Sequence, residues 1–139
     1  VYGLPGLEPA TQIRHSDRIG DVQFSPHRDE LAIGSSRTGR AFWNTTTWHQ
    51  TKVLTNFARI LYTPDQNRAW LSSDFRRAGL YDLRTLEPEL MLPTGMLPLA
   101  LSPDGRRIVV SVDFRRLQLW DLSMVRAELA TLGLDWSDR

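Results

Sequence analysis

Three segments of the 139-residue sequence repeat the same pattern of marker residues. In each, an apolar or aromatic residue precedes Ser-Pro or Thr-Pro, and the three prolines are 38 and then 39 residues apart. An aromatic residue follows each proline after 17 positions, and Asn or Asp comes next. This spacing, kept over three copies, indicates a repeat protein built from one supersecondary unit. The markers are Pro26, Trp43 and Asn44; Pro64, Tyr81 and Asp82; and Pro103, Trp120 and Asp121.

Each copy reads as short β-strands separated by turns. The first strand ends at the Ser/Thr-Pro turn, the second is a run of apolar or small residues, and the third ends at the aromatic residue. A fourth, weaker strand follows in the first two copies. The expected first strands are 22–24, 59–62 and 99–101, the second strands 31–33, 69–71 and 108–110, and the fourth strands 51–54 and 89–92.

The turns themselves have recognisable chemistry, seen best in Ser102-Pro103-Asp104-Gly105. Proline presets φ, Asp bonds the local backbone, and Gly accepts a positive φ. A helical interpretation would have to cross Pro26, Pro64 and Pro103. We therefore predict an all-β fold: a partial β-propeller of about three four-stranded antiparallel blades with a short C-terminal helix.

These residues also carry a family resemblance. Trp120-Asp121-Leu122, preceded by Ser102-Pro103-Asp104-Gly105, resembles the WD-repeat family of β-propellers. Tyr81-Asp82-Leu83 and Phe42-Trp43-Asn44 are degenerate versions of the same position, and the resemblance covers residues 1–122. The family's Gly-His dipeptide is mostly missing; only His15 falls where that histidine is expected. The resemblance thus implies a partial His–Ser–Asp–Trp hydrogen-bond network and a stronger reliance on apolar packing.

The expected organisation is a single partial propeller over residues 1–139. Residues 1–15 are predicted to end an upstream blade, because Tyr2 lies 41 residues before Trp43. About three and a half repeats are too few to close a ring. We therefore expect a C-terminal piece of a larger propeller, and the alternative is a ring completed by several chains. The predicted blades are 18–54, 57–92 and 97–122, followed by a helix and tail at 123–139.

The C-terminal segment has a different pattern. Val125, Leu129 and Leu132 form one apolar stripe of a helix over residues 123–132, with Ser123 as its N-cap and Gly133 at the position after its end. Leu134 and Trp136 are expected to hold the tail against the last blade. Residues 127–136 resemble the closing segment of WD-repeat proteins from planctomycete-type bacteria, which implies a propeller that often follows a serine/threonine protein kinase domain.

Nothing in the sequence favours a catalytic, metal or cofactor site. The three histidines lack metal-ligand spacing, and no nucleophile elbow, P-loop or dinucleotide fingerprint occurs. The chain has no cysteine, which excludes disulfides, zinc-thiolate sites and cysteine nucleophiles. The repeated aspartates Asp65, Asp82, Asp104 and Asp121 are expected to bond their own turns. We expect this segment not to be an enzyme and to need no cofactor.

A tetrapeptide repeat is the most distinctive candidate for binding. Asp74-Phe75-Arg76-Arg77 recurs 39 residues later as Asp113-Phe114-Arg115-Arg116, and Arg37-Thr38-Gly39-Arg40 stands at that place in the first copy. These turns are predicted to lie side by side on one rim of the propeller, where Arg and aromatic residues favour protein contacts. The alternative is a set of turn-stabilising aspartates with merely solvated arginines. The candidate rim residues are Arg37, Arg40, Phe75, Arg76, Arg77, Phe114, Arg115 and Arg116.

We interpret the chain as a non-catalytic protein–protein interaction scaffold. The alternatives are a regulatory or substrate-recruiting module of a bacterial serine/threonine protein kinase, and a propeller enzyme with its site in the central channel. The expected partners are proteins or peptides and the remaining blades of its own propeller. With 17 basic and 16 acidic residues, nucleic acid is disfavoured, and no apolar run is long enough for membrane insertion. We expect a cytoplasmic location, or an extracytoplasmic one if the parent protein has a membrane span.

Overall fold

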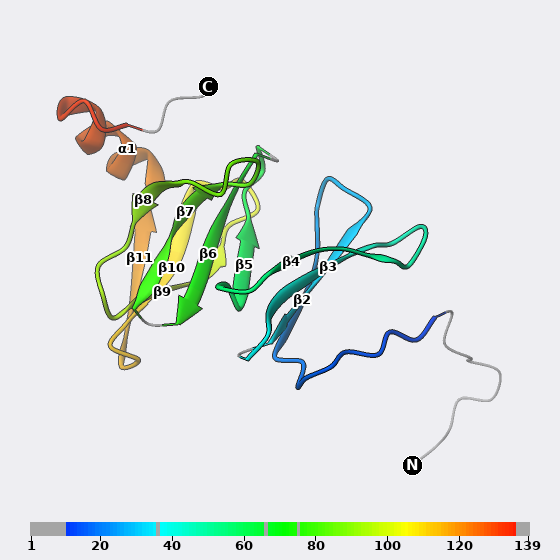
Figure 1. Cartoon of the computed structure of the whole chain (residues 1–139). Helices are drawn as coiled ribbons and strands as arrows, with labels where there is room; N and C mark the ends of the chain where they lie inside the picture. Colours follow the sequence, from blue (N-terminus) through cyan, green and yellow to red (C-terminus); the bar gives the residue numbers. More distant parts are fainter. Residues whose placement is uncertain (1–10, 36, 66, 75, 136–139) are drawn as a thin grey trace, which may run out of the picture.

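The computed structural model describes residues 11–35, 37–65, 67–74 and 76–135, without the side chain of residue 74. The described part is mostly β-structure, as predicted. It contains three antiparallel sheets in chain order, which we name sheets A, B and C, and one short helix near the C-terminus (Figure 1). No sheet closes on itself in this part of the chain.

Each sheet is a simple meander of neighbouring strands. Sheet A consists of β1 (Asp21–Phe24), β2 (Glu30–Ser35), β3 (Gly39–Asn44) and β4 (Gln50–Leu54). Sheet B consists of β5 (Arg59–Tyr62), β6 (Arg68–Asp74), β7 (Arg77–Asp82) and β8 (Pro88–Met91). Sheet C has three strands, β9 (Met96–Leu101), β10 (Arg107–Val112) and β11 (Arg116–Asp121), and the helix α1 (Leu122–Thr131) follows where the other sheets have a fourth strand.

The three aromatic markers occupy the same place in their sheets. Each is the second-last residue of a third strand and lies opposite an apolar residue of the second strand. The register pairs are Leu31 with Trp43, Ala69 with Tyr81, and Ile108 with Trp120. The periodicity of the sequence is therefore a periodicity of the structure. Their burial differs, because Tyr81 is fully buried whereas Trp43 and Trp120 are half-buried.

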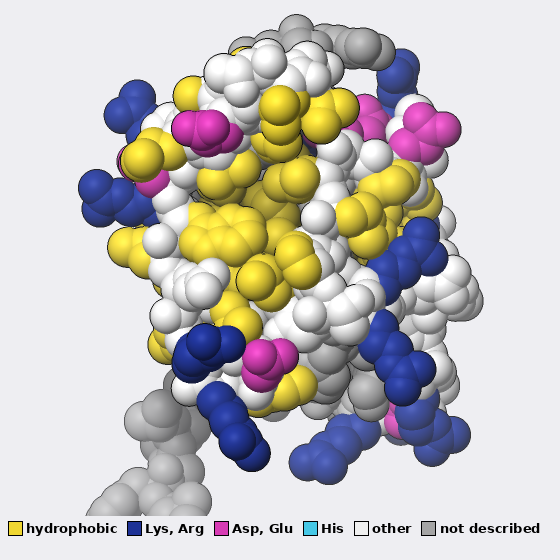
Figure 2. Space-filling view, turned by 90° about the vertical axis from the view of Figure 1, so that its left-hand side faces the viewer, with side chains coloured by type: hydrophobic (Ala, Val, Ile, Leu, Met, Phe, Trp, Pro, Cys, Tyr) yellow, Lys and Arg dark blue, Asp and Glu magenta, His cyan; other side chains and the backbone are white. Residues whose placement is uncertain are grey.

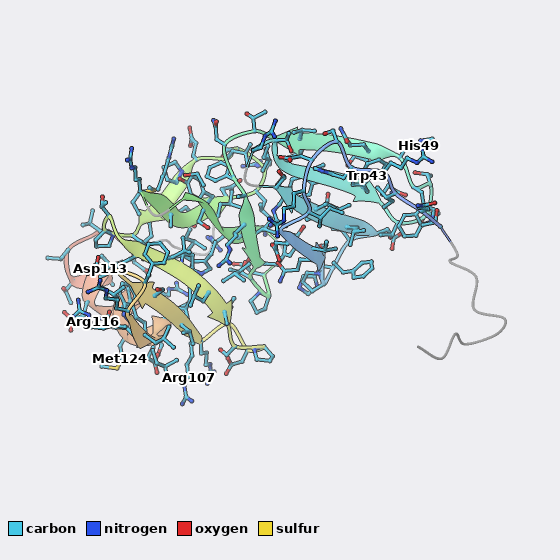
Figure 3. The ribbon with its side chains drawn as sticks, turned by 90° about the horizontal axis from the view of Figure 1, so that it is seen from below. Trp43, His49, Arg107, Asp113, Arg116 and Met124 are labelled. Carbon is cyan, nitrogen blue, oxygen red and sulfur yellow. The ribbon has the colours of Figure 1, made fainter. Side chains whose placement is uncertain are left out.

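Two hydrophobic cores join the three sheets into successive layers (Figure 3). Alternate residues along a strand point to opposite faces, so a middle sheet contributes to both cores. Tyr81 of sheet B packs in the core shared with sheet A, where its ring meets Phe57 edge to face at 5.1 Å between centroids. Trp70 and Leu80, on the other face, pack in the core shared with sheet C.

The Asn or Asp after each aromatic residue starts the next turn. The side chains of Asn44, Asp82 and Asp121 each accept a hydrogen bond from the backbone N–H two residues later, at 2.7–3.0 Å. In the first two sheets the turn then reverses through a residue in the left-handed region, Trp48 (φ 57°) or Leu86 (φ 60°). That reversal brings the chain back as β4 or β8.

After Asp121 the chain continues as helix α1 instead. The N-cap is Asp121, so the expectation that Ser123 caps the helix is wrong: Ser123 donates both its backbone N–H and its hydroxyl to the Asp121 carboxylate. Gly133 follows the helix with φ 69°, as predicted. Leu122 is the only described residue of α1 that is buried, and Leu134 is exposed, so Leu134 does not hold the tail against sheet C.

Only part of the segment predicted to end an upstream blade, residues 1–15, can be compared with the structure. Residues 1–10 and Trp136 lie outside the described residues. Residues 11–15, the described part of this predicted blade end, form no strand.

Candidate interaction surface

Three turns lie at the same end of the molecule. They are the hairpin connections between the second and third strands of the sheets: β2 to β3, β6 to β7 and β10 to β11 (Figure 1). The second strands run in the same direction through the stacked sheets, so their ends reach one end of the molecule together. Figure 2 shows Lys and Arg side chains toward this lower end. We call the three turns the turn row.

The first turn is held by a hydroxyl and a carboxylate. Ser35 donates its hydroxyl proton to Asp17 at 2.5 Å and accepts the backbone N–H groups of Arg37 and Thr38. The Ser35 hydrogen bond, followed by the backbone N–H of Arg18, keeps the pKa of Asp17 below its usual value. The Arg37 side chain lies 3.8 Å from the same carboxylate and is 83% exposed. The described part of this turn thus presents one arginine, Arg37, to solvent.

Arg40 does not belong to this exposed surface, so its assignment to the rim is wrong. Its side chain is fully buried between sheets A and B. It forms an ion pair with Asp21 of β1 and donates to the Ala58 carbonyl at 2.5 Å. Burial lowers the pKa of Arg40, and the bond to Asp21 opposes that shift. The signal was the alternation along β3, which places Arg40 on the same face as the buried Phe42.

The second turn follows a break in the register of sheet B. A bulge lies between Ser72 and Asp74, and Asp74 then pairs with Arg77 across the hairpin. Arg76 and Arg77 are both exposed. Phe75 lies outside the described residues. The turn therefore adds two arginines to the row, with the backbone locally re-aimed by the bulge.

The third turn is tight and strained. The N–H of Arg115 donates to the Val112 carbonyl at 3.1 Å, and the two central residues, Asp113 (φ 49°) and Phe114 (φ 58°), are left-handed. Such turns suit the twist of a hairpin but favour Asn and Gly, and an aromatic residue there costs energy. Phe114 is 60% exposed. A strained, exposed aromatic residue beside two arginines is a candidate contact residue.

Arg115 and Arg116 complete the row. Both are exposed, and Arg116 lies 3.5 Å from the Asp113 carboxylate in an exposed pair (Figure 3). Exposed pairs of this kind contribute at most about 1 kcal/mol. The guanidinium can therefore exchange Asp113 for a carboxylate of another molecule at small cost.

The repeated aspartates at the opposite end have the local role expected of them. Asp104 accepts the Ser102 hydroxyl at 2.6 Å and the Arg106 backbone N–H at 3.0 Å. Asp65 likewise accepts the Thr63 hydroxyl and the backbone N–H groups of residues 67 and 68. The bond from Ser102, followed by the bond from the Arg106 backbone, lowers the pKa of Asp104. At this end Asp65 and Asp104 therefore bond their own turns.

One ion cluster has no counterpart among the features predicted from the sequence. Arg68 of β6, nearly buried, donates to Glu89 of β8 at 2.6 Å and to Asp65 at 2.8 Å. Burial disfavours the charged guanidinium, but the two carboxylates outweigh it and raise the pKa of Arg68. The contact with Glu89 depends on the return of the chain as β8, and the expected strand at 89–92 did not by itself indicate that Glu89 meets Arg68 of β6.

The described residues contain no group of three or more His, Asp and Glu side chains that could hold a metal ion. Among them there is likewise no helix of the length and hydrophobicity needed to cross a membrane. In comparisons with known proteins, no family model and no curated protein matches this chain.

Proposed function

We propose that this chain is a segment of a WD-repeat-type β-propeller and acts as a non-catalytic protein-interaction scaffold. The observation that supports this function is the turn row. Three register-equivalent hairpins present arginines at one end of a stack of sheets. A scaffold of stacked sheets keeps such residues at fixed separations, which reduces the entropy lost when a partner binds.

The chemistry of the row favours a partner segment rich in carboxylates. Arg37, Arg77, Arg115 and Arg116 are exposed cations, and guanidinium groups bind carboxylates in a bidentate geometry. Phe114 adds an exposed apolar surface beside them. Arginine with an aromatic neighbour is the composition found at the energetic centres of protein interfaces.

The test uses the full chain and a fluorescein-labelled oligo-glutamate peptide, followed by fluorescence anisotropy. A triple variant, R77A/R115A/R116A, removes three exposed cations of the turn row. We expect its affinity to fall about tenfold, the equivalent of about 1.4 kcal/mol. The melting temperature should stay at the wild-type value, because the three side chains are exposed.

The matched control removes the same number of charges from the opposite end. Arg84, Arg106 and Arg107 are exposed residues of turns and a strand start there, and R84A/R106A/R107A changes the net charge identically. This control should retain wild-type affinity. An equal loss in both variants, or tighter binding of a single-stranded oligonucleotide than of the peptide, would overturn the proposal.

A further inference from the structure

Sheet C leaves one apolar face uncovered. Leu117 and Leu119 of β11 point away from sheet B and are 70% and 65% exposed. They lie on the same face as Val109 of β10, because directly paired residues share a face of a sheet. Figure 2 looks at the end of the molecule that carries β11 and α1 and shows hydrophobic side chains at its centre. We call Val109, Leu117 and Leu119 the trailing face.

The repeat shows what normally happens at these positions. The pair Val109–Leu119 is equivalent in register to Ala32–Phe42 in sheet A and to Trp70–Leu80 in sheet B. In sheets A and B both members of the pair are buried, and each packs in the core shared with the following sheet. The trailing face therefore has the residues of an inter-sheet core without the next sheet.

The opposite end of the molecule carries the complementary surface. Val22 and Phe24 of β1 are 51% and 65% exposed. Their register equivalents in sheet B are Ile60, which is fully buried, and Tyr62, which packs against the core shared with sheet A. We call Val22 and Phe24 the leading face.

In sheet C the first strand, β9, is the strand that meets the preceding sheet. At the boundary between sheets B and C, β9 makes contacts with β5, β6 and β7. On the same face of sheet A as Val22 and Phe24, the residues Leu31, Ile33 and Ala41 of β2 and β3 are already buried. In sheet A the apolar surface still available on this side is therefore on β1, the strand expected to make the contact.

We propose that the trailing face of one chain binds the leading face of a second copy, head to tail. The two boundaries inside the chain pack a trailing face against a leading face, and the chain exposes one of each. A symmetrical contact between two trailing faces would use a packing that neither internal boundary shows. Because the contact joins different surfaces, it leads to a closed ring or an open series of copies. It involves neither Arg77, Arg115 nor Arg116, so it goes beyond the proposed function.

The experiment measures the mass of the full chain by sedimentation over a range of concentrations. Wild type should associate. Two variants, L117E/L119E and V22E/F24E, each block one face at exposed positions and should be monomeric alone. Mixed together, they should form a 1:1 dimer that grows no further, because each supplies the face that the other lacks. Circular dichroism checks folding, and serine in place of glutamate serves if a glutamate variant unfolds.

Met124→Glu is the matched control. Met124 lies on α1 and is as exposed as Leu119, but it has no register equivalent in the other sheets. This variant should associate like wild type. A wild-type chain that stays monomeric at every concentration would overturn the proposal. So would association of V22E/F24E alone, because that result indicates a contact between two trailing faces.

Discussion

The Tyr62 hydroxyl of β5 donates a hydrogen bond to the Glu30 carboxylate of β2, with 3.1 Å between the oxygens. The two residues belong to different sheets, so the bond ties sheet B to sheet A. Apolar packing tolerates small displacements, whereas a hydrogen bond requires a particular distance and angle. Burial, and then the nearby Glu30 charge, raises the pKa of Tyr62 above its usual value.

Tyr62→Phe should therefore change how the free energy of unfolding falls at alkaline pH. The folded state holds the phenolic proton more tightly than the unfolded chain does. The resulting stability is complete below about pH 10, the ordinary pKa of tyrosine, and is lost as pH rises above it. Urea denaturation should show that wild type loses free energy of unfolding above about pH 10 and that the variant loses less. An identical alkaline loss in both proteins would contradict this assignment.

The buried Arg40 gives a prediction about asymmetry within one ion pair. Asp21→Asn leaves a fully buried guanidinium without its charge partner, and such a change costs about 3–5 kcal/mol. Arg40→Met leaves a carboxylate that is 38% exposed and can be rehydrated. Its equivalents, Ala78 and Leu117, are apolar, so methionine suits the position.

The two single variants and the double variant D21N/R40M should be compared by urea denaturation. We expect Arg40→Met to be less destabilised than Asp21→Asn, and the double variant to recover part of the Asp21→Asn loss. If Arg40→Met is the more unstable single variant, the buried charge is not the main cost.

Trp70 and Trp120 should differ although both are tryptophans of β-strands. Trp70 is fully buried in the core between sheets B and C, whereas Trp120 is half-buried at its margin. Trp70→Ala should lower the free energy of unfolding by about 3–5 kcal/mol, and Trp120→Ala by less. Guanidinium denaturation of both variants checks the order, and equal losses would place Trp120 deeper in the core than the structure does.

The turn aspartates lead to a prediction about how stability is lost at acidic pH. The backbone N–H of Thr85, the largest cause, lowers the pKa of Asp82. A lowered folded-state pKa contributes stability that is present above about pH 4 and lost as pH falls through that pKa. Thermal melts between about pH 7 and pH 3 should show this loss in wild type and less of it in Asp82→Asn.

At neutral pH the two Asp82 variants should separate the charge from the hydrogen bond. Asp82→Ala removes the acceptor and should cost about 1 kcal/mol. Asp82→Asn keeps an acceptor and should cost less. If the two variants melt together at neutral pH, the turn does not depend on this hydrogen bond.

The strand order could be predicted because its signals are local. A proline ends the first strand, an apolar run forms the second, and an aromatic residue with Asn or Asp ends the third. The pairing of Ile108 with Trp120 then follows from the length of one hairpin. The exposed arginines of the turn row were also within reach, since a hairpin between buried strands must emerge at the surface.

The remaining features depend on contacts between sheets. Arg40 was expected at the surface because its turn is exposed, but the carbonyl of Ala58 and the carboxylate of Asp21 come from other elements. Leu117 has the same apolar character as buried residues, and only its neighbours decide its exposure. β9 begins at Met96 rather than Leu99, because a register shift beside Val109 and Val110 lets the chain continue pairing past Pro98.

Asp82 and Asp121 cap their turns in the same way but lead into different elements. After Asp82 a left-handed Leu86 returns the chain as β8, and after Asp121 the same kind of carboxylate cap starts α1. The outer edge of β11 thereby lacks the neighbour that β8 gives to β7. A protein engineer could thus graft residues 83–92 in place of 122–131 and add a fourth strand to the edge of sheet C without altering a single residue of the existing sheets.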